Sequence, residues 1–400
     1  MAWQAFVFIF RQSFKMKVVV SLAALLLLRF GAHAQIALSD EAEVSVITCG
    51  PGQTELYSAF GHSALRVIDP VNGFDLAFNY GVFDFNQPNF YINFARGHNY
   101  YKLAVQDYQR FEYVYKYYNR YVHEQVLNLT AWQKQRLFDY LQWNARPENQ
   151  SYLYDYFYDN CATKLPQILT KVFGDSVRFN DSHITTRYSF RELTDLYLMW
   201  QPWGDLGIDI CLGLPMDKKA TPYQYMFLPD YVEAGFDNAT LNGLPLVKQK
   251  NLVYESQPEE LRNGLFQPLY VFTLFAIVVI ILSWYDMKRK KLSNRLDVFL
   301  FGAVGAIGLL LFLLWTATDH RAATNNLNIL WALPTHLVVA FALLKPRKWL
   351  KPYFFTVVFI NVALVITWAW LPQKLHYALI PVVVALLARA FVRIRISPTS

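Results

Sequence analysis

The segment Leu269–Trp284 reads LYVFTLFAIVVIILSW and contains no charged residue. An apolar run of this kind approaches the roughly 20 residues that a helix needs to cross the hydrocarbon core of a bilayer. Further apolar runs follow at Val298–Trp315, Ile329–Leu344, Phe354–Leu371 and Tyr377–Val392. The third and fifth runs contain Pro334 and Pro381, which are tolerated where neighbouring helices cover the backbone. The sequence therefore predicts an all-α bundle of five transmembrane helices over residues 266–400.

Lysines and arginines cluster in alternate connections of this predicted bundle. Twelve of them follow the first run, the third run or the fifth run, whereas the other two connections carry only Arg321 and Lys374. The twelve are Lys288, Arg289, Lys290, Lys291, Arg295, Lys345, Arg347, Lys348, Lys351, Arg389, Arg393 and Arg395. Because cytoplasmic loops are enriched in positive charge, the preceding domain and the Arg321 loop are predicted to lie outside the cytoplasm.

The N-terminus has the features of an export signal. An apolar run from Val18 to Leu28 is followed by Ala32-His33-Ala34 before Gln35, which is a small-x-small cleavage pattern. An uncleaved anchor that also uses Phe6–Phe10 is the competing interpretation. We therefore expect a signal peptide at 1–34, an exported domain at 35–265 and a membrane domain at 266–400.

Composition supports this division and excludes other classes of protein. With 54% hydrophobic and 17% aromatic residues, the 400-residue chain is too apolar for a single ordinary soluble domain. The net charge of +7 arises mainly beside the C-terminal apolar runs, so it indicates membrane topology and not nucleic-acid binding. No His-Glu-x-x-His or Cys-x-x-Cys pattern occurs, so no metal site is predicted.

Residues 35–265 are predicted to mix strands and helices. A strand over Glu43–Thr48 precedes a candidate hairpin whose strands are Ser63–Ile68 and Phe74–Tyr80, with a turn around Asn72-Gly73. Side chains alternate between the faces of a strand, so any register that aligns the apolar faces of the hairpin places His62 and Asn79 together. An asparagine there is suited to orient the imidazole of a Cys–His site.

The candidate nucleophile is Cys161, in Tyr158-Asp159-Asn160-Cys161-Ala162-Thr163-Lys164. Asp159 or Asn160 is suited to cap a helix that begins at the cysteine, and a helix N-terminus stabilises a thiolate. Pro166 removes one backbone donor early in this helix, so a start near Thr163 is the alternative.

The other cysteines leave two questions open. Cys49 is a weaker candidate nucleophile, because it enters a Gly-Pro-Gly turn with no helix N-terminus beside it. A disulfide between Cys49 and Cys211 that leaves Cys161 free is compatible with export, as are three reduced thiols.

The order of a histidine on a strand and a later cysteine at a helix start resembles the circularly permuted papain-like group that includes lecithin:retinol acyltransferase. The chain resembles the Lnb-type lipoprotein N-acyltransferases of Bacteroidetes more closely, and this likeness extends over nearly the whole mature chain. The stretches that carry it are 48–52 (TCGPG), 60–62 (FGH), 78–81 (FNYG), 159–164 (DNCATK), 225–229 (YMFLP) and the Asp319-His320 loop.

This resemblance implies an α+β permuted papain-like periplasmic domain on a bacterial inner membrane, and an acyltransferase activity without a cofactor. The Cys161 thiolate would attack an ester of a membrane phospholipid, with His62 as general base and backbone N–H groups at the helix start as oxyanion donors. A diacylated lipoprotein would then receive the acyl chain from the thioester on the α-amine of its N-terminal cysteine.

The expected substrate-binding residues come from two parts of the chain. Asn160, Lys164 and Tyr80 lie in the stretches that carry the resemblance. Asp319, His320, Asn326 and Asn328 lie in the polar outer loop, which is either a solvated turn or a set of hydrogen-bonding groups for a lipid head group or the active site.

Two other functions remain compatible with the sequence. One is a membrane-anchored cysteine hydrolase, acting as a peptidase, an amidase or a phospholipase with the same Cys161 and His62. The other is a non-catalytic envelope sensor, whose function would survive replacement of Cys161 by serine. A five-span anchor favours the acyltransferase, because a cell-wall hydrolase seldom needs one.

Overall fold

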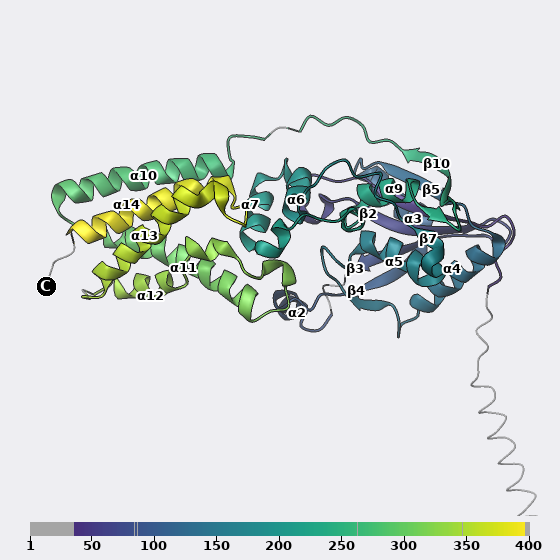
Figure 1. Ribbon diagram of the computed structural model, residues 1–400, viewed down its shortest axis with the longest axis horizontal. Helices are drawn as coiled ribbons and strands as arrows, with labels where there is room; N and C mark the ends of the chain where they lie inside the picture. Colours follow the sequence, from purple (N-terminus) through teal and green to yellow (C-terminus); the bar gives the residue numbers. More distant parts are fainter. Residues whose placement is uncertain (1–35, 84, 86, 262, 346, 397–400) are drawn as a thin grey trace, which may run out of the picture. The chain divides into compact units, whose positions relative to one another are not determined.

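The computed structural model describes residues 36–83, 85, 87–261, 263–345 and 347–396 (Figure 1). The chain divides into two compact units, Met1–Leu38 and Ser39–Ser400, and the second contains every element described below. The predicted signal peptide at 1–34 lies outside the described residues.

An antiparallel sheet organises the first part of the second unit. Its strands follow the spatial order β10-β5-β1-β2-β3-β4-β6. They are β1 (Glu43–Cys49), β2 (His62–Asp69), β3 (Phe74–Val82), β4 (Tyr100–Asp107), β5 (Val122–Leu127), β6 (Ser151–Leu153) and β10 (Val247–Tyr254). A small second sheet contains β7 (Val177–Arg178), β8 (Thr240–Leu241) and β9 (Leu244–Pro245). The predicted first strand and hairpin are therefore confirmed, and the hairpin provides adjacent strands within the large sheet.

The helices of this part of the chain are α2 (Phe90–Arg96), α3 (Tyr108–Tyr117), α4 (Ala131–Asn144), α5 (Cys161–Phe173), α6 (Phe190–Leu198), α7 (Pro202–Cys211), α8 (Pro222–Tyr225) and α9 (Pro229–Asp237). Of these, α3, α4, α5 and α9 pack against the large sheet, on both of its faces. Phe111 of α3 packs with Ala64 and Ala77 on one face. On the other face, Phe78 of β3 makes an edge contact with Phe138 of α4, at 6.3 Å between ring centroids. Because side chains alternate between the two faces along β2 and β3, each face of the sheet packs into its own hydrophobic core.

The C-terminal part is helical, as predicted. It contains α10 (Pro268–Arg289), α11 (Asn294–Thr316), α12 (Thr335–Ala342), α13 (Leu350–Thr367) and α14 (Ile380–Ile396), with α10 beside α14 and α11 beside α12 (Figure 1). Within the described residues, four helical segments are long and apolar enough to cross a membrane: 268–289, 294–316, 350–370 and 377–396.

The third predicted run differs from the expectation of a full-length span. It forms a shorter apolar helical segment, Leu327–Ala342, in which a 3-10 turn at Leu327–Leu330 precedes α12. Pro334 stands at the N-cap of α12, where a residue without an N–H is compatible with a new helix start but not with an unbroken helix. The proline thus separates the two pieces of the run.

A buried ion-pair network joins three of the membrane helices. Arg389 of α14 donates to Asp297 of α11 at 2.5 Å and to Asp286 of α10 at 2.8 Å, and Arg393 donates to Asp297 at 2.5 Å. Arg389 and Asp297 are completely buried. These two arginines are therefore not free flanking charges, as the topology argument assumed, although the remaining basic residues still favour the same orientation.

Helices α6 and α7 connect the sheet-containing part to the membrane helices through buried hydrogen bonds. Arg191 of α6 is fully buried and pairs with Asp209 at 2.7 Å and Asp217 at 3.0 Å. Gln373, in the connection between α13 and α14, donates to the carbonyl of Leu212 at 3.0 Å. These contacts fix the outer connections of the membrane helices against the soluble part.

The observed architecture is thus a sheet-and-helix domain followed by a helical membrane domain. The strand order does not by itself identify a permuted papain-like arrangement, and that part of the expectation stays a prediction.

Candidate active site

The hairpin register places His62 and Asn79 on one face, as the alternation predicted. Leu65 pairs with Phe78 and Arg66 with Ala77, so His62 and Asn79 lie diagonally across the two strands. Nε2 of His62 lies 2.7 Å from Oδ1 of Asn79. Because an amide oxygen only accepts, Nε2 carries the hydrogen, and the lone pair of Nδ1 is left for the thiol.

Cys161 is the first residue of α5, so the predicted helix start is confirmed at the cysteine and not near Thr163. The side chain of Asn160 accepts from the N–H groups of Ala162 and Thr163, both at 2.9 Å. Thr163 returns the contact by accepting from the N–H of Asn160 at 2.8 Å, which completes a capping box. Pro166 is accommodated inside the helix.

Two glycines permit the close approach of strand and helix at this point. Gly81 has a φ of +85°, and a Cβ there would lie 3.5 Å from Cβ of Cys161. Gly61 has a φ of +80°, and a Cβ there would lie 2.8 Å from the carbonyl oxygen of Cys49. A side chain at either position would be strained by its backbone conformation. The positive φ values and close contacts therefore explain why glycine occupies positions 61 and 81.

The electrostatics favour a thiolate–imidazolium pair. Burial alone would raise the pKa of Cys161, but the charge of His62 and hydrogen bonds from His62 and from the N–H groups of Ser63 and Ala162 lower it below its ordinary value. Burial alone would lower the pKa of His62, but the Cys161 charge and hydrogen bonds with Cys161 and Asn79 raise it. The two opposite shifts have the same cause, which is the contact between these side chains.

Cys49 is distinguished from Cys161 by its surroundings, although it pairs directly with His62 across β1 and β2. Its side chain is fully buried in an apolar cluster, and burial raises the pKa of its thiol far above the ordinary value. Cys161 retains 8% exposure. All three cysteines are free thiols, so the disulfide considered between Cys49 and Cys211 is not formed.

Sequence reasoning did not identify the residues that pack beside the imidazole of His62. The ring of Tyr115 stacks on the imidazole at 6.1 Å between centroids and 13° between planes. The guanidinium of Arg120 lies 4.7 Å from the centroid of Tyr115, and its Nε donates to the carbonyl of Gly50 at 2.6 Å. The only sequence signal was the Cys49-Gly50-Pro51-Gly52 stretch, because the partners come from α3 and the chain after it.

The predicted substrate-binding residues of the soluble part have structural partners. Both N–H bonds of the Asn160 side chain are used, because Nδ2 donates to the carbonyls of Tyr156 and Phe227. Lys164 pairs with Asp159 at 2.7 Å and lies 4.0 Å from the Tyr152 ring centroid. Tyr80 is buried, and its hydroxyl donates to Asn144 of α4 at 2.7 Å. The structure thus gives Asn160 a capping role and Tyr80 a packing role.

The polar outer loop is likewise occupied by internal contacts. Asp319 accepts from His98 at 2.7 Å, and Nε2 of His320 lies 3.0 Å from the carbonyl of Phe94. Asn326 donates to the carbonyls of Ile210 and Cys211, and Asn328 is fully buried. The loop is therefore a docked segment and not a freely solvated turn, and its four predicted ligands hold it against α2 and α7.

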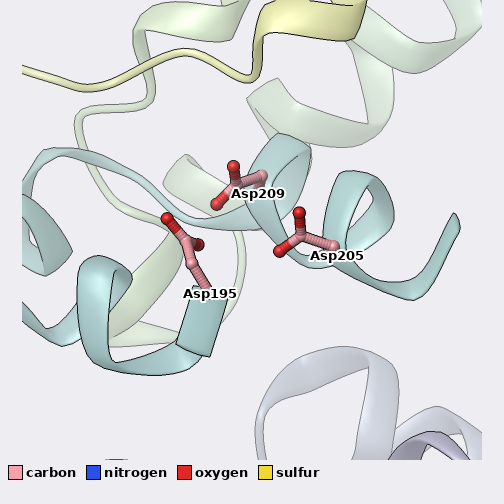
Figure 2. A group of neighbouring side chains, drawn as sticks. All are labelled: Asp195, Asp205 and Asp209. Carbon is pink, nitrogen blue, oxygen red and sulfur yellow. The ribbon is translucent and has the colours of Figure 1, made fainter. Parts of the chain in front are cut away.

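Three carboxylates converge outside the Cys–His pair. Asp195 of α6 and Asp205 and Asp209 of α7 point toward one another, with oxygen atoms within 4.8 Å (Figure 2). Each has a cationic or imidazole partner in the protein: Lys374 at 3.2 Å, His376 at 3.2 Å and Arg191 at 2.7 Å, respectively. The cluster is thus an ionic link between α6, α7 and the connection that precedes α14.

Comparison with known families adds to this geometry. Residues 32–195 match the Lnb N-terminal periplasmic domain, and residues 260–399 match the Lnb transmembrane domain, whose model is named for five transmembrane helices. The chain belongs to the Lnb family. His62, Asn79 and Cys161 all lie within the first match. No similar protein was found among the curated proteins, and no similar structure was found among the solved structures.

Family membership fixes the location of the two domains. The sheet-containing domain is periplasmic, and the helical domain makes this a multi-pass protein of the inner membrane. The side of the membrane predicted from loop charges is thereby confirmed.

Proposed function

We propose that this Lnb-type protein is a lipoprotein N-acyltransferase that uses Cys161 as its nucleophile. The observation that carries the proposal is the placement of the Cys161 thiol at a helix start, beside an imidazole that is held by Asn79. A thiolate stabilised in this way is a nucleophile for acyl transfer. The membrane domain gives the same protein access to acyl donors in the bilayer.

In the first half-reaction, the Cys161 thiolate attacks the ester carbonyl of a membrane phospholipid. The carbon–sulfur bond forms, the carbon–oxygen ester bond breaks, and the leaving lysophospholipid oxygen takes the proton from Nδ1 of His62. The N–H groups of Ala162 and Thr163 already donate to the Asn160 cap, and that of Ala162 also contacts the Cys161 sulfur, so the N–H of Cys161 itself is the oxyanion donor that we assign at the helix start.

In the second half-reaction, the neutral α-amine of a diacylated lipoprotein attacks the thioester. An amide bond forms, the carbon–sulfur bond breaks, and His62 accepts the proton that the amine loses. Asn79 keeps Nε2 protonated through both halves, so Nδ1 exchanges the proton each time. No group outside the chain and its two substrates enters this balance.

The surroundings of Cys161 favour transfer to an amine over hydrolysis. Gly81 brings β3 against Cys161, and the ring of Tyr154 lies beside both. Tyr154 belongs to an aromatic group in which its ring centroid is 4.3 Å from that of Tyr101. A site enclosed by aromatic rings limits the access of water to the thioester. Both lipid substrates are confined to the membrane, which raises their concentration at the site.

The test is mass spectrometry of a lipoprotein N-terminal peptide from cells that lack the protein and are complemented with variants. Wild type and the control Cys211→Ser should restore the amide-linked third acyl chain, whereas Cys161→Ser should not. The same purified variants, given phospholipid without acceptor, should show an acyl group on the Cys161 peptide that hydroxylamine removes.

Each failure has a distinct meaning. Persistence of the third chain without the protein would refute the acyltransferase function. Acylation of Cys161 followed by release of free fatty acid in the presence of the lipopeptide would instead indicate a phospholipase. Restoration by Cys161→Ser would support a non-catalytic role.

A further inference from the structure

One basic residue of the outer loop has no acidic partner. Asp319, His320, Asn326 and Asn328 are held by contacts within the protein. Arg321, in the same loop, is exposed, and within the described part of the chain no carboxylate lies within ion-pair distance of its guanidinium. Among the described residues, Arg321 is therefore a positive charge of this loop without an acidic partner.

This arginine lines a cavity of about 370 Å³ with Tyr158, Pro215, Met216 and Thr324. The lining offers the guanidinium and the Tyr158 hydroxyl as donors, because the Thr324 hydroxyl donates to the carbonyl of Arg321 at 2.9 Å. Among the five described lining residues, Arg321 is the charged one. The charge of Arg321 also acts on Tyr158, because it opposes the rise in the tyrosine pKa that burial and Asp155 cause. A cavity with donors and one positive charge suits an anion.

Two neighbouring features indicate that the cavity lies near the depth of lipid head groups. The transmembrane helix α11 ends at Thr316, shortly before Arg321. The same loop holds α2, since the N–H of Asp319 donates to the carbonyl of Arg96 at 2.9 Å. No residue of α2 is buried, and Tyr91 and Ile92 are 74% and 60% exposed. An exposed apolar helix docked beside the end of a membrane span places this loop at the bilayer surface.

The cavity is also close to the nucleophile along the chain. Tyr158 precedes Cys161 by three residues, and three residues span at most about 11 Å. In a glycerophospholipid, only the glycerol unit separates the phosphate from the ester carbonyls. A phosphate held beside Tyr158 is bound within a few residues of the nucleophile along the chain, as the short glycerol linkage requires.

We infer that the Arg321 cavity binds the phosphodiester of the phospholipid acyl donor. The inference rests on the proposed function for its substrate and adds a residue that selects and positions it. Arg321 forms a charge-assisted pair with the phosphate, and the hydroxyl group of Tyr158 donates to one of its remaining oxygens. A donor lipid without phosphate gains nothing from this cavity.

The experiment measures acylation of Cys161 in the full-length protein against donor concentration. Phosphatidylethanolamine is compared with diacylglycerol, which has the same esters and no phosphate, for wild type, Arg321→Gln, Arg321→Lys and the control Arg178→Gln. Arg178 is an exposed arginine on β7, in the soluble domain. Arg321→Gln should raise the half-saturating phosphatidylethanolamine concentration about tenfold or more, with a maximal rate within about twofold of wild type. Arg321→Lys should lie between, and diacylglycerol should show no effect.

An unchanged half-saturating concentration in Arg321→Gln would overturn the inference. A site for free phosphate makes a different prediction. Inorganic phosphate bound at Arg321 would then suppress the acylation of wild-type Cys161 by diacylglycerol. That result would overturn the assignment of the cavity to a lipid head group.

A second measurement separates this inference from the proposed function. A phospholipid with a photoreactive head group is cross-linked to Cys161→Ser protein, which cannot form the thioester. Peptides that contain Tyr158 or Arg321 should be labelled, and Arg321→Gln should remove the label. Labelling without acylation of wild type would leave the lipid site standing while the proposed reaction fails, whereas labelling that ignores Arg321→Gln would refute the site.

Discussion

Replacement of Asn79 by alanine tests the part of the site that sets the state of His62. The side-chain oxygen of Asn79 lies 2.7 Å from Nε2 of His62. We assign this ring nitrogen to the side of the imidazole that faces away from Cys161. Alanine removes this acceptor without removing the thiol, the imidazole or the helix cap. The expected defect is therefore one of proton position and charge and not one of folding.

The magnitude follows from the single hydrogen bond that is lost. A hydrogen bond to a charged group contributes roughly 1.5–3 kcal/mol, and a tenfold change in rate corresponds to about 1.4 kcal/mol. Asn79→Ala should therefore lower kcat/KM for acyl transfer by about 10- to 150-fold. The hydrogen bond with Asn79 raises the pKa of His62, so its loss should lower that pKa and raise the pKa of the Cys161 thiol.

Alkylation of Cys161 by iodoacetamide across pH measures this effect without any lipid substrate. Wild type should react at a pH below the ordinary range of a thiol, because the pKa of Cys161 is lowered. In Asn79→Ala the alkylation profile of Cys161 should move to higher pH. Asn79→Asp retains an acceptor for Nε2 of His62 and should not show this shift. Cys49 serves as an internal control and should stay unlabelled, since its side chain is fully buried.

The reasoning fails if Asn79→Ala retains acyl transfer within about twofold of wild type and the same alkylation profile. It also fails if Cys49 reacts before Cys161 in folded protein.

Three further predictions concern regions outside this pair. Burial and two neighbouring carboxylates raise the pKa of Asp195 to about 7. Between about pH 4 and pH 7 the folded protein therefore holds a proton on Asp195 that the unfolded chain has lost. The free energy of unfolding should fall as pH rises through this range. Asp195→Asn should remove that fall, and its Tm advantage over wild type in detergent should be larger at pH 8 than at pH 5; an equal advantage at both would contradict the assignment. Arg389→Met removes the arginine that pairs with buried Asp286 and leaves buried Asp297 with Arg393 alone, so it should cost about 3–5 kcal/mol, measured by denaturant unfolding. The exposed control Arg395→Met should cost little. A photoreactive amino acid at Tyr91 of α2 should cross-link to phospholipid, while one at Trp132 of α4, which is 64% exposed, should not; equal labelling of the two would argue against insertion of α2.

The hairpin and the start of α5 were predictable because their signals are local. Alternation along β2 and β3 decides which side chains share a face, and the turn between them fixes the register closely enough to place His62 near Asn79. The cap at Asn160 acts within three residues of its own chain position. Both features depend on short-range backbone geometry, which the sequence encodes directly.

The membrane part was predictable in its extent but not in its details. Long apolar runs identify spans because a bilayer requires backbone hydrogen bonds to be satisfied within each segment. The sequence marked the third run as interrupted by Pro334, but it did not show that Arg389 and Arg393 are buried against Asp297. Those outcomes depend on which helix packs beside which, and that information is distributed over residues far apart in the chain.

The sequence by itself determined the division into an exported domain and a membrane domain and the orientation, and it predicted that His62 and Asn79 share a face and that Cys161 begins a helix. Only the tertiary structure decided which polar residues are free to act. It committed the side-chain N–H groups of Asn160 to the carbonyls of Tyr156 and Phe227, held Asn326 and Asn328 against α7, and left Arg321 exposed at a cavity. The physical reason is that the hydrogen-bonding groups of a polar side chain can be bonded to partners more than a hundred residues away in the chain. No local sequence pattern identifies those partners.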